Sequence, residues 1–392
     1  MRLLILTRTY PPNPGAVGHL VKELCEALIK NDWQIAVVTS GIPHDSDSVE
    51  FPLKICRVKS LPFTRKNHLL RALSYLSLYP SMLWTAACQR RPDVIVTTTD
   101  PPLQAVVGVL LKVFFRCKLV HWCQDLYPEM AEEAGILRKG GLLAKMLRWI
   151  STQTLKHHDR VVSIGRCMTQ RLVIRGIAAE KMTEIQNWTD PEWIHPVPEQ
   201  ENDFWIREKL KGRFVVVYSG NLGLAHSFKE ILDAAKLLQT ESPEVLFLFI
   251  GDGPRRAEVE AGAKMRLLSN VKFLPAQSWG KISESLSAGQ VHLVSLRENL
   301  TGLVVPSKFY GIMAAGRPCI FIGPPDCEVA RLIAEKGVGE VVQTRDALVA
   351  AIREYGRHPQ KQETEGIRAR LLGENATLAE ASLKFSRILN EH

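Results

Sequence analysis

In one segment of the sequence, a glycine-containing loop leads to a lysine at the start of an expected helix. In VVPSKFYGIMAAGRPCIF, residues 304–321, Ser307 and Lys308 stand at that start. A serine can cap a helix, and an ammonium in the first turn lies close to free backbone N–H groups, so the pair would suit an anion such as a diphosphate. The alternative is an ordinary capped helix with a solvated lysine.

Two glycine-containing loops also follow apolar runs, after residues 3–7 and after residues 214–220. Glycine lets a ligand approach the backbone, but a loop that only needs turn residues would contain it as well. The string GDGPRR at 251–256 is similar to a dinucleotide fingerprint, yet it lacks the last glycine and follows a second strand, which disfavours hydride transfer. The loop residues that we consider for ligand contact are Gly15, Gly18, Gly220, Asn221, His226 and Gly251.

The segment CQDLYPE, residues 123–129, offers a carboxylate for acid–base chemistry. Asp125 follows an expected strand at its carboxyl end, where a base could accept the proton of an acceptor hydroxyl. A supporting role for Asp125, as a helix cap or a salt-bridge partner, is the alternative, and both are open. His121 and Glu129 are weaker candidates, because one lies within a strand and the other begins a helix.

Short apolar or β-branched runs alternate with helical patterns and must position these loops. This alternation is typical of βαβ units with parallel sheets, in which ligands bind at the carboxyl ends of the strands. We therefore predict an α/β protein with two doubly wound domains. The runs are 3–7, 35–39, 53–58, 93–98, 118–123 and 160–164 in the first half, and 214–220, 246–251, 271–275, 291–296 and 318–323 in the second.

The boundary between the two domains is predicted near residue 195. Residues 187–203 are rich in proline and lack an apolar period, which indicates a linker. The first domain would then span 1–195 and the second 196–373. Residues 374–392 form a last amphipathic helix that we expect to pack back on the first domain.

Composition and charge narrow the class of protein. The chain has 392 residues, 46% of them hydrophobic, and is too long to form a single ordinary hydrophobic core. The eight cysteines include no CxxC pair, so we expect buried, reduced thiols.

The positive charge of the chain lies mostly in its first half. Residues 1–200 hold 25 Lys and Arg against 18 Asp and Glu (+7), whereas residues 201–392 hold 25 against 23 (+2). The basic residues form no long run, so we expect an anionic surface near the first half rather than nucleic acid.

No segment has the length of an export signal or a membrane span. The longest apolar stretch, 101–115, is interrupted by Gln104 and Lys112 and is shorter than the ~20 residues of a spanning helix. We expect a cytoplasmic protein.

Residues 64–92 combine basic residues with a long apolar and aromatic helix, which suits either an interfacial helix on anionic lipid or a buried helix with basic ends. The basic residues are Arg65, Lys66, Arg71, Arg90 and Arg91.

Taken in order along the chain, these segments resemble glycosyltransferase family four, the retaining transferases of GT-B fold. The resemblance covers residues 1 to about 345, and CQDLYPE and IQNWTD look like the branch that builds bacterial surface polysaccharides. It implies a nucleotide-sugar donor held mainly by the second domain, an acceptor held mainly by the first, and reaction with retention and without metal or cofactor. The segments that carry it are TYPPNPGAVGHLVKELCEALIKNDWQIAVVTS, VVVYSGNLGLAHSFKEILDAA, FIGDGP and VVPSKFYGIMAAGRPCIF.

The resemblance also assigns residues by position. Gly15 and Gly18 match the glycines beside the donor diphosphate and the acceptor, and Lys308 matches a lysine of this branch. Backbone N–H groups of the loop before it should reach the diphosphate or the sugar. The loop residues are Thr301, Gly302 and Leu303.

The sequence departs from the family at four positions. Asn221 and His226 replace an Arg and a Lys that neutralise the diphosphate, and Leu303 and Gly311 replace the paired glutamates. The carboxylate expected to hold the donor ribose is therefore missing. Candidates to restore the charge are Arg8, Lys308, Arg166 and Arg297, and candidates for the ribose are Glu298 and Glu328.

These observations together predict a glycosyltransferase that moves a sugar from a nucleoside diphosphate sugar, with UDP favoured, to an acceptor hydroxyl. The expected acceptor is a lipid-linked glycan at the inner membrane surface. A nucleotide-sugar epimerase and a sugar-binding protein without enzymatic activity are the alternatives. The first would need no separate acceptor, and the second would usually carry an export signal.

Overall fold

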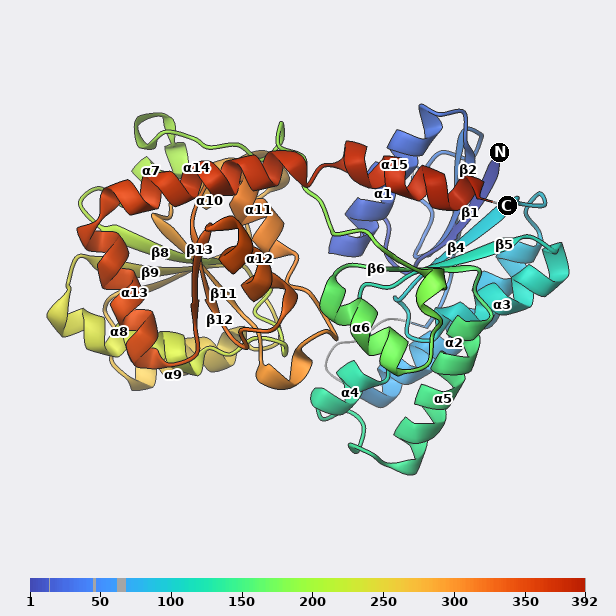
Figure 1. Cartoon of the computed structure of the whole chain (residues 1–392), viewed down its shortest axis with the longest axis horizontal. Coiled ribbons are helices and arrows are strands. Elements are labelled where there is room, and N and C mark those ends of the chain that lie inside the picture. The colour runs from blue at the N-terminus through green and yellow to red at the C-terminus, as the bar shows by residue number, and fades with distance from the viewer. Residues whose placement is uncertain (14, 45–46, 62–67, 392) are drawn as a thin grey trace. The chain divides into compact units, whose positions relative to one another are not determined.

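A computed structural model describes residues 1–13, 15–44, 47–61 and 68–391 of the chain (Figure 1). The chain folds into two compact units, which are described separately. Unit 1 comprises Met1–Asn187, Gly302–Val305 and Leu378–His392, and unit 2 comprises Trp188–Thr301 and Pro306–Thr377.

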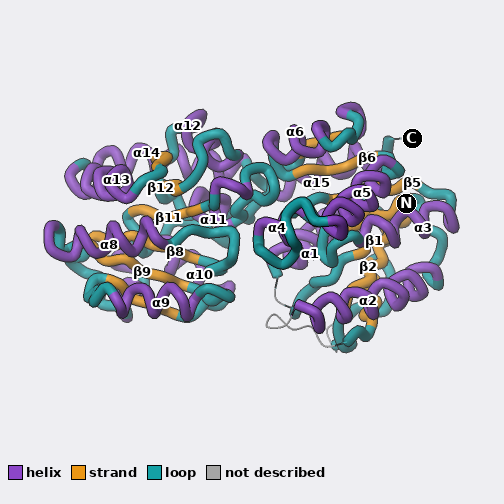
Figure 2. The backbone as a smooth tube through the Cα atoms, turned by 90° about the horizontal axis from the view of Figure 1, so that it is seen from below, coloured by secondary structure: helices purple, strands orange, loops and turns teal. Residues whose placement is uncertain are grey.

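Unit 1 is built on a seven-stranded sheet with the order β3-β2-β1-β4-β5-β6-β7. All neighbouring strands are parallel. In Figure 2 the labelled strands of this sheet, β6, β5, β1 and β2, follow one another in this order. The order reverses between β1 and β4, so a crevice is expected at the carboxyl ends of these strands. The strands are β1 (Arg2–Leu6), β2 (Gln34–Ser40), β3 (Leu53–Val58), β4 (Val94–Thr98), β5 (Lys118–Trp122), β6 (Arg160–Ser163) and β7 (Met182–Glu184).

Helices cover both faces of this sheet. In Figure 1, α1 (Ala16–Ile29) and α15 (Leu378–Asn390) lie on one side, and α2 (His68–Ala87), α3 (Gln104–Phe115) and α5 (Leu142–Lys156) lie on the other. The Phe385 ring of α15 packs edge-on against Trp122 of β5 at 4.9 Å between centroids. The remaining helices are α4 (Glu129–Glu133), η1 (Ala179–Lys181) and α6 (Arg166–Ile174).

Unit 2 is built on a six-stranded parallel sheet with the order β10-β9-β8-β11-β12-β13. Its central strands are almost wholly buried, which explains their continuous apolar sequences. The strands are β8 (Phe214–Ser219), β9 (Val245–Ile250), β10 (Val271–Leu274), β11 (Val291–Ser295), β12 (Cys319–Ile322) and β13 (Gly339–Val342). The helices are η2 (Glu199–Glu201), α7 (Asp203–Arg207), α8 (Lys229–Glu241), α9 (Arg256–Met265), η3 (Trp279–Lys281), α10 (Ile282–Ser287), η4 (Glu298–Leu300), α11 (Lys308–Ala314), α12 (Glu328–Lys336), α13 (Arg345–Arg357) and α14 (Pro359–Asn375).

The predicted fold class is confirmed, because both units are parallel α/β sheets with helices around them. Every apolar run of the sequence coincides with a strand to within two residues. The sequence analysis missed β7 and β13, which are short strands at the edges of their sheets. All eight cysteines lie in the described part of the chain and are thiols rather than disulfides, and five of them are buried. Among the described residues, no helix has the length and hydropathy to cross a bilayer.

Candidate active site

The carboxyl ends of β1 and β4 in unit 1 are joined by an ion pair. Arg8 Nε donates to Asp100 Oδ1 and Arg8 Nη2 donates to Asp100 Oδ2, both at 2.7 Å. Two parallel bonds of this kind hold a guanidinium firmly. Arg8, which we considered as a replacement cation for the donor diphosphate, is thus already engaged by a carboxylate.

The loop that carries Asp125 is fixed from two sides. The Thr99 hydroxyl, just beyond β4, accepts the Gln124 N–H at 2.8 Å and the Asp125 N–H at 3.5 Å. On the other side, the buried amides of Gln124 and Asn187 bond to each other. Sequence analysis missed Thr99 and the amide pair as supports of this loop, because their partners are far apart in the chain.

The Asp125 carboxyl is partly buried and close to a second acid. Burial, together with the nearby charge of Asp100, raises the pKa of Asp125 to about 7. Both causes disfavour the carboxylate, so the group changes protonation near neutral pH. This is the property of a general base at physiological pH.

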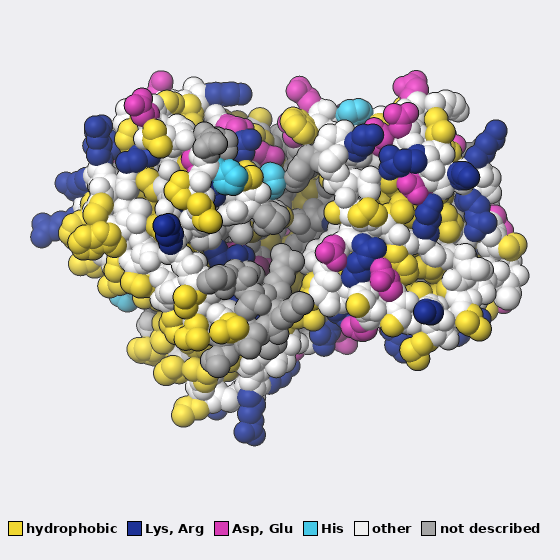
Figure 3. Space-filling view, turned by 180° about the vertical axis from the view of Figure 1, so that it is seen from behind, with side chains coloured by type: hydrophobic (Ala, Val, Ile, Leu, Met, Phe, Trp, Pro, Cys, Tyr) yellow, Lys and Arg dark blue, Asp and Glu magenta, His cyan; other side chains and the backbone are white. Residues whose placement is uncertain are grey.

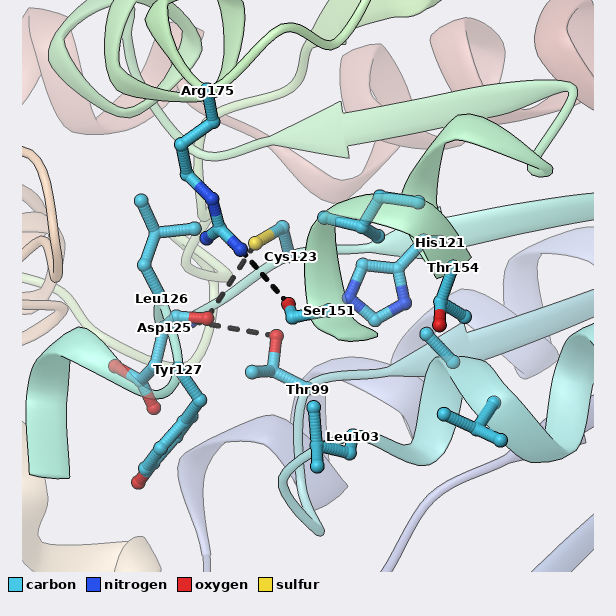
Figure 4. A pocket seen from close by; sticks show the side chains of 13 residues that line it. Thr99, Leu103, His121, Cys123, Asp125, Leu126, Tyr127, Ser151, Thr154 and Arg175 are labelled. Atoms are coloured by element: carbon cyan, nitrogen blue, oxygen red, sulfur yellow. Dashed lines mark hydrogen bonds between the residues drawn. The ribbon is translucent and has the colours of Figure 1, made fainter. Parts of the chain in front are cut away.

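A cavity of about 20 Å³ lies behind the Asp125 loop, with room for about one water. Figure 4 shows Asp125 and Tyr127 on one side of it and His121 on the other. Arg175 reaches the same cavity and donates to the Ser151 hydroxyl at 3.0 Å. A sugar would not fit in this space, so the cavity belongs to the support of the loop rather than to an acceptor site.

The two weaker candidates of the sequence analysis are engaged in structural contacts. His121 is buried, with Nδ1 2.8 Å from the Thr97 hydroxyl, and burial lowers its pKa well below the ordinary value. Glu129 pairs with Arg148 at 3.0 Å and lies 3.5 Å from Arg175. These contacts favour a supporting role for both residues.

In unit 2, glycines bring the ends of β8 and β9 together. A Cβ on Gly251 would lie 2.2 Å from the Gly220 carbonyl oxygen, so only glycine fits there. A Cβ on Gly220 would lie 3.4 Å from Lys308 Cε, and Gly220 has φ of +119°. Gly251 therefore serves the packing of the strand ends, and Gly220 leaves room for the lysine.

Lys308 lies against an aromatic ring at this edge of unit 2. Its Nζ is 3.7 Å from the centroid of the Tyr218 ring and 3.5 Å from the Asn221 carbonyl oxygen. Burial lowers the pKa of the Lys308 ammonium well below its ordinary value. Within the described part of the chain, no carboxylate forms a salt bridge with it. Tyr218 was not predicted, although it ends the apolar run of β8.

His226 lies beside the same lysine but supplies no charge. Its Nδ1–H donates to the Ser295 carbonyl at 2.5 Å, and burial, followed by the charge of Lys308, lowers its pKa to about 3. The neutral ring then has an acceptor at Nε2, which suits a hydroxyl rather than a phosphate oxygen. His226 therefore does not replace the family's lysine.

The expectation that Ser307 caps α11 is wrong. Ser307 makes no side-chain bond to the helix, because its backbone is already helical (φ −61°, ψ −24°) and not extended as in an N-cap. Gly311 lies on α11 with Ile194 and Leu286 as the nearest atoms to an added Cβ, both at 3.6 Å. The place of the family's second glutamate is thus apolar.

The other predicted residues are distributed over both units. Gly15 precedes α1, and a Cβ on Gly18 would lie 2.9 Å from the Thr9 carbonyl oxygen, so small residues let α1 pack on the loop after β1. Thr301 belongs to unit 2, whereas Gly302 and Leu303 belong to unit 1.

Of the remaining replacements that we considered, Arg297 binds the loop before α8, since its N–H donates to the Ala225 carbonyl at 2.9 Å. Glu298 is exposed in η4, and Glu328 is buried at the start of α12. Arg166 begins α6 of unit 1.

Comparison with known proteins gives one consistent class. Residues 15–188 match the family model of the glycosyl transferase 4-like domain, and residues 199–371 match that of glycosyl transferases group 1. The chain is 27% identical to the probable glycosyltransferase WbjE of Pseudomonas aeruginosa over 86% of this chain and 84% of that protein. It is 26% identical to the putative colanic acid biosynthesis glycosyl transferase WcaI of Escherichia coli (strain K12), over 90% and 92%.

Solved structures agree with this class at the level of the fold. The crystal structure of Anabaena Alr3699/HepE in complex with UDP and glucose superposes with a TM-score of 0.77 at 16% identity, and 99% of each chain is covered. Two doubly wound units of this kind define the GT-B fold of glycosyltransferases. The chain belongs to glycosyltransferase family four.

Proposed function

We propose that the protein transfers a sugar from a nucleoside diphosphate sugar, with UDP favoured, to a hydroxyl of an acceptor. The observation that carries the proposal is Lys308, which lies over the Tyr218 ring beside Gly220 and has no carboxylate partner among the described residues. A diphosphate would supply the missing counter-charge, and its negative charge would return the proton that burial disfavours.

The donor site is assigned to unit 2, around this lysine. Asn221, His226 and Ser307 lie on the loops next to Lys308. The family resemblance adds the backbone N–H group of Thr301, which also belongs to unit 2. The crystal structure of HepE is in complex with UDP and glucose, which supports uracil as the base of the donor.

The acceptor site is assigned to the carboxyl edge of the sheet in unit 1, with Asp125 as the base. The acceptor oxygen attacks the anomeric carbon, the bond from that carbon to the diphosphate breaks, and the hydroxyl proton passes to Asp125. A pKa of about 7 allows the carboxylate to be present at neutral pH and to keep the proton after transfer. The family resemblance further implies retention of configuration without metal or cofactor.

The proposed acceptor is a lipid-linked glycan of surface polysaccharide biosynthesis, at the inner face of the cell membrane. The name of WcaI, which refers to colanic acid biosynthesis, supports this class of pathway. The basic excess of the first half of the chain supports a location next to anionic lipid.

A thermal-unfolding screen with UDP-, GDP- and ADP-sugars tests the donor site. A ligand at a hundred times its dissociation constant stabilises the folded state by about 2.7 kcal/mol, which is easily measured. Absence of a shift with all of them would contradict the donor site. Release of nucleoside diphosphate that requires an added acceptor separates a transferase from an epimerase, which needs none.

A further inference from the structure

The outer sides of α2, α3 and α5 carry exposed, large hydrophobic side chains. Trp84 of α2, Val113 of α3 and Leu142 of α5 are 75%, 73% and 86% exposed. Figure 3 shows hydrophobic side chains gathered over the lower left of the view, on unit 1. We call the following set the outer apolar surface: Leu73, Leu76 and Trp84 of α2, Leu110, Val113 and Phe114 of α3, and Leu142, Leu143, Met146 and Trp149 of α5.

The core of unit 1 does not account for these side chains, because the helices bury other residues. Leu78 and Met82 of α2, Leu111 and Phe115 of α3 and Leu155 of α5 point into the unit. Each helix is thus apolar on its inner and on its outer side. A helix that is hydrophobic on both sides is normally covered on both.

The three helices form one continuous layer, and none of them contributes a negative charge. α3 packs against α2 and against α5. None of the three helices contains Asp or Glu, whereas together they hold Arg71, Lys112, Lys145, Arg148 and Lys156. Lys112 pairs with Asp159, and Arg148 pairs with Glu129 and Glu132, so neighbouring segments already balance these two charges. Lys145 is exposed within the outer apolar surface, and Arg116 is exposed just after α3.

We propose that the outer apolar surface of unit 1 binds an anionic lipid bilayer, with its Trp, Phe and Leu side chains in the headgroup region and the exposed Lys145 and Arg116 toward the phosphates. Tryptophan and leucine beside basic residues are the composition of interfacial helices. A second copy of the chain would bring the same positive charge face to face, which disfavours self-association through this surface.

The position of the surface fits the proposed acceptor. Helices that connect parallel strands begin at the carboxyl edge of the sheet, so the first turn of α5, with Leu142 and Leu143, lies toward the edge that carries Asp125. A bilayer there would present a lipid-linked acceptor at that edge. This last step rests on the proposed function, whereas binding of the surface to lipid does not.

The sequence analysis had considered residues 64–92 alone for this role. Arg65 and Lys66 lie outside the described residues. α2 combines the two alternatives. Leu78 is buried in the core, as in a buried helix, whereas Trp84 is exposed, as in an interfacial helix. The larger share of the surface comes from α3 and α5, which the sequence analysis did not consider for binding at a lipid surface.

Co-sedimentation of the full chain with vesicles tests the proposal. The wild type is expected to bind vesicles of phosphatidylcholine with about 30% phosphatidylglycerol, to ignore pure phosphatidylcholine, and to be released as salt screens the charges. The double variant Phe114→Glu/Trp149→Glu should bind at least about tenfold more weakly, because each charge would enter the apolar region. The matched control is Met265→Glu, an 83% exposed methionine on α9 of unit 2, which should bind like the wild type.

Circular dichroism and the unfolding temperature show whether the double variant is folded, and Leu142→Ser/Leu143→Ser provides a milder second test with the same expected direction. Equal binding by the wild type and both folded variants would overturn the proposal. So would a wild-type dimer without vesicle binding that the double variant dissociates, because the occupant would then be a second copy. Vesicle binding needs neither donor nor acceptor, so the nucleotide-sugar screen fails or succeeds independently.

Discussion

The side-chain amides of Gln124 and Asn187 bond to each other in both directions, each nitrogen donating to the other's oxygen at 3.0 Å. Both residues are buried, at 6% and 3% exposure. The pair satisfies two polar groups that would otherwise be stranded away from water. It also fixes the residue directly before Asp125.

Replacement of Asn187 by Leu should therefore destabilise the protein by about 1 to 3 kcal/mol, since the Gln124 amide would be buried without a partner. The double variant Gln124→Leu/Asn187→Leu should lose less than the sum of the two single variants. Chemical denaturation of the four proteins measures this coupling. Additive losses would show that the pair does not act as a unit.

Turnover depends on Asp125 if it is the base. Asp125→Asn keeps the shape of the side chain but removes its basicity, so turnover should fall at least about 100-fold while donor affinity stays nearly unchanged. In the wild type, turnover should rise with pH through about 7, the pKa of Asp125, and this limb should disappear in the variant. Initial rates against pH, together with donor titrations, provide the measurement.

Near-normal turnover in a folded Asp125→Asn variant would remove Asp125 from the chemistry. The leaving phosphate of the donor would then be the next candidate for the base. His121 is disfavoured, because it is buried and its pKa is lowered well below the ordinary value.

The raised pKa of Asp125 also predicts how stability depends on pH. The folded-state pKa of about 7 exceeds the ordinary value of 3.8, so the folded protein holds the proton more tightly than the unfolded chain. The stability that this provides is complete below about pH 4 and is lost as the pH rises through 7. The unfolding temperature of wild type relative to Asp125→Asn should decrease between these pH values, and a constant difference would contradict the raised pKa.

The strands could be predicted from sequence because a strand buried on both faces needs a continuous apolar run, and residues 214–219 and 291–295 have one. The second of these runs also indicates that the loop leading to Lys308 begins at the end of a strand. The contact of Lys308 with the Tyr218 ring could not be predicted, because a tyrosine within an apolar strand indicates only a core residue.

Other features depend on contacts that a sequence pattern does not contain. Gln124 and Asn187 meet although they are 63 residues apart. α3 is apolar at Leu111 and at Val113, and only the packing decides that the first is buried and the second exposed. Ser307 was expected to cap because of its type, but capping depends on a backbone conformation that the residue does not adopt.

Lys308 should govern both the strength and the pH dependence of donor binding. Lys308→Ala is expected to cost about 1.5 to 3 kcal/mol, roughly 10- to 150-fold in the dissociation constant of a UDP-sugar, which is the range for a charged hydrogen bond. The matched control is Lys264→Ala, an exposed lysine on α9, which should bind like the wild type.

The pH dependence follows from the lowered pKa of Lys308 in the free protein. Binding of a diphosphate would raise that pKa, so the complex takes up a proton and the affinity of the wild type should weaken as the pH rises between the two values. Lys308→Met lacks the titrating amine and should bind with an affinity that hardly changes over the same range. Calorimetric titrations with a UDP-sugar in buffers of different ionisation enthalpy measure the proton uptake directly. Equal affinity and equal proton uptake in wild type and Lys308→Met would return Lys308 to an ordinary helix lysine, and the donor diphosphate would have to be held elsewhere in unit 2.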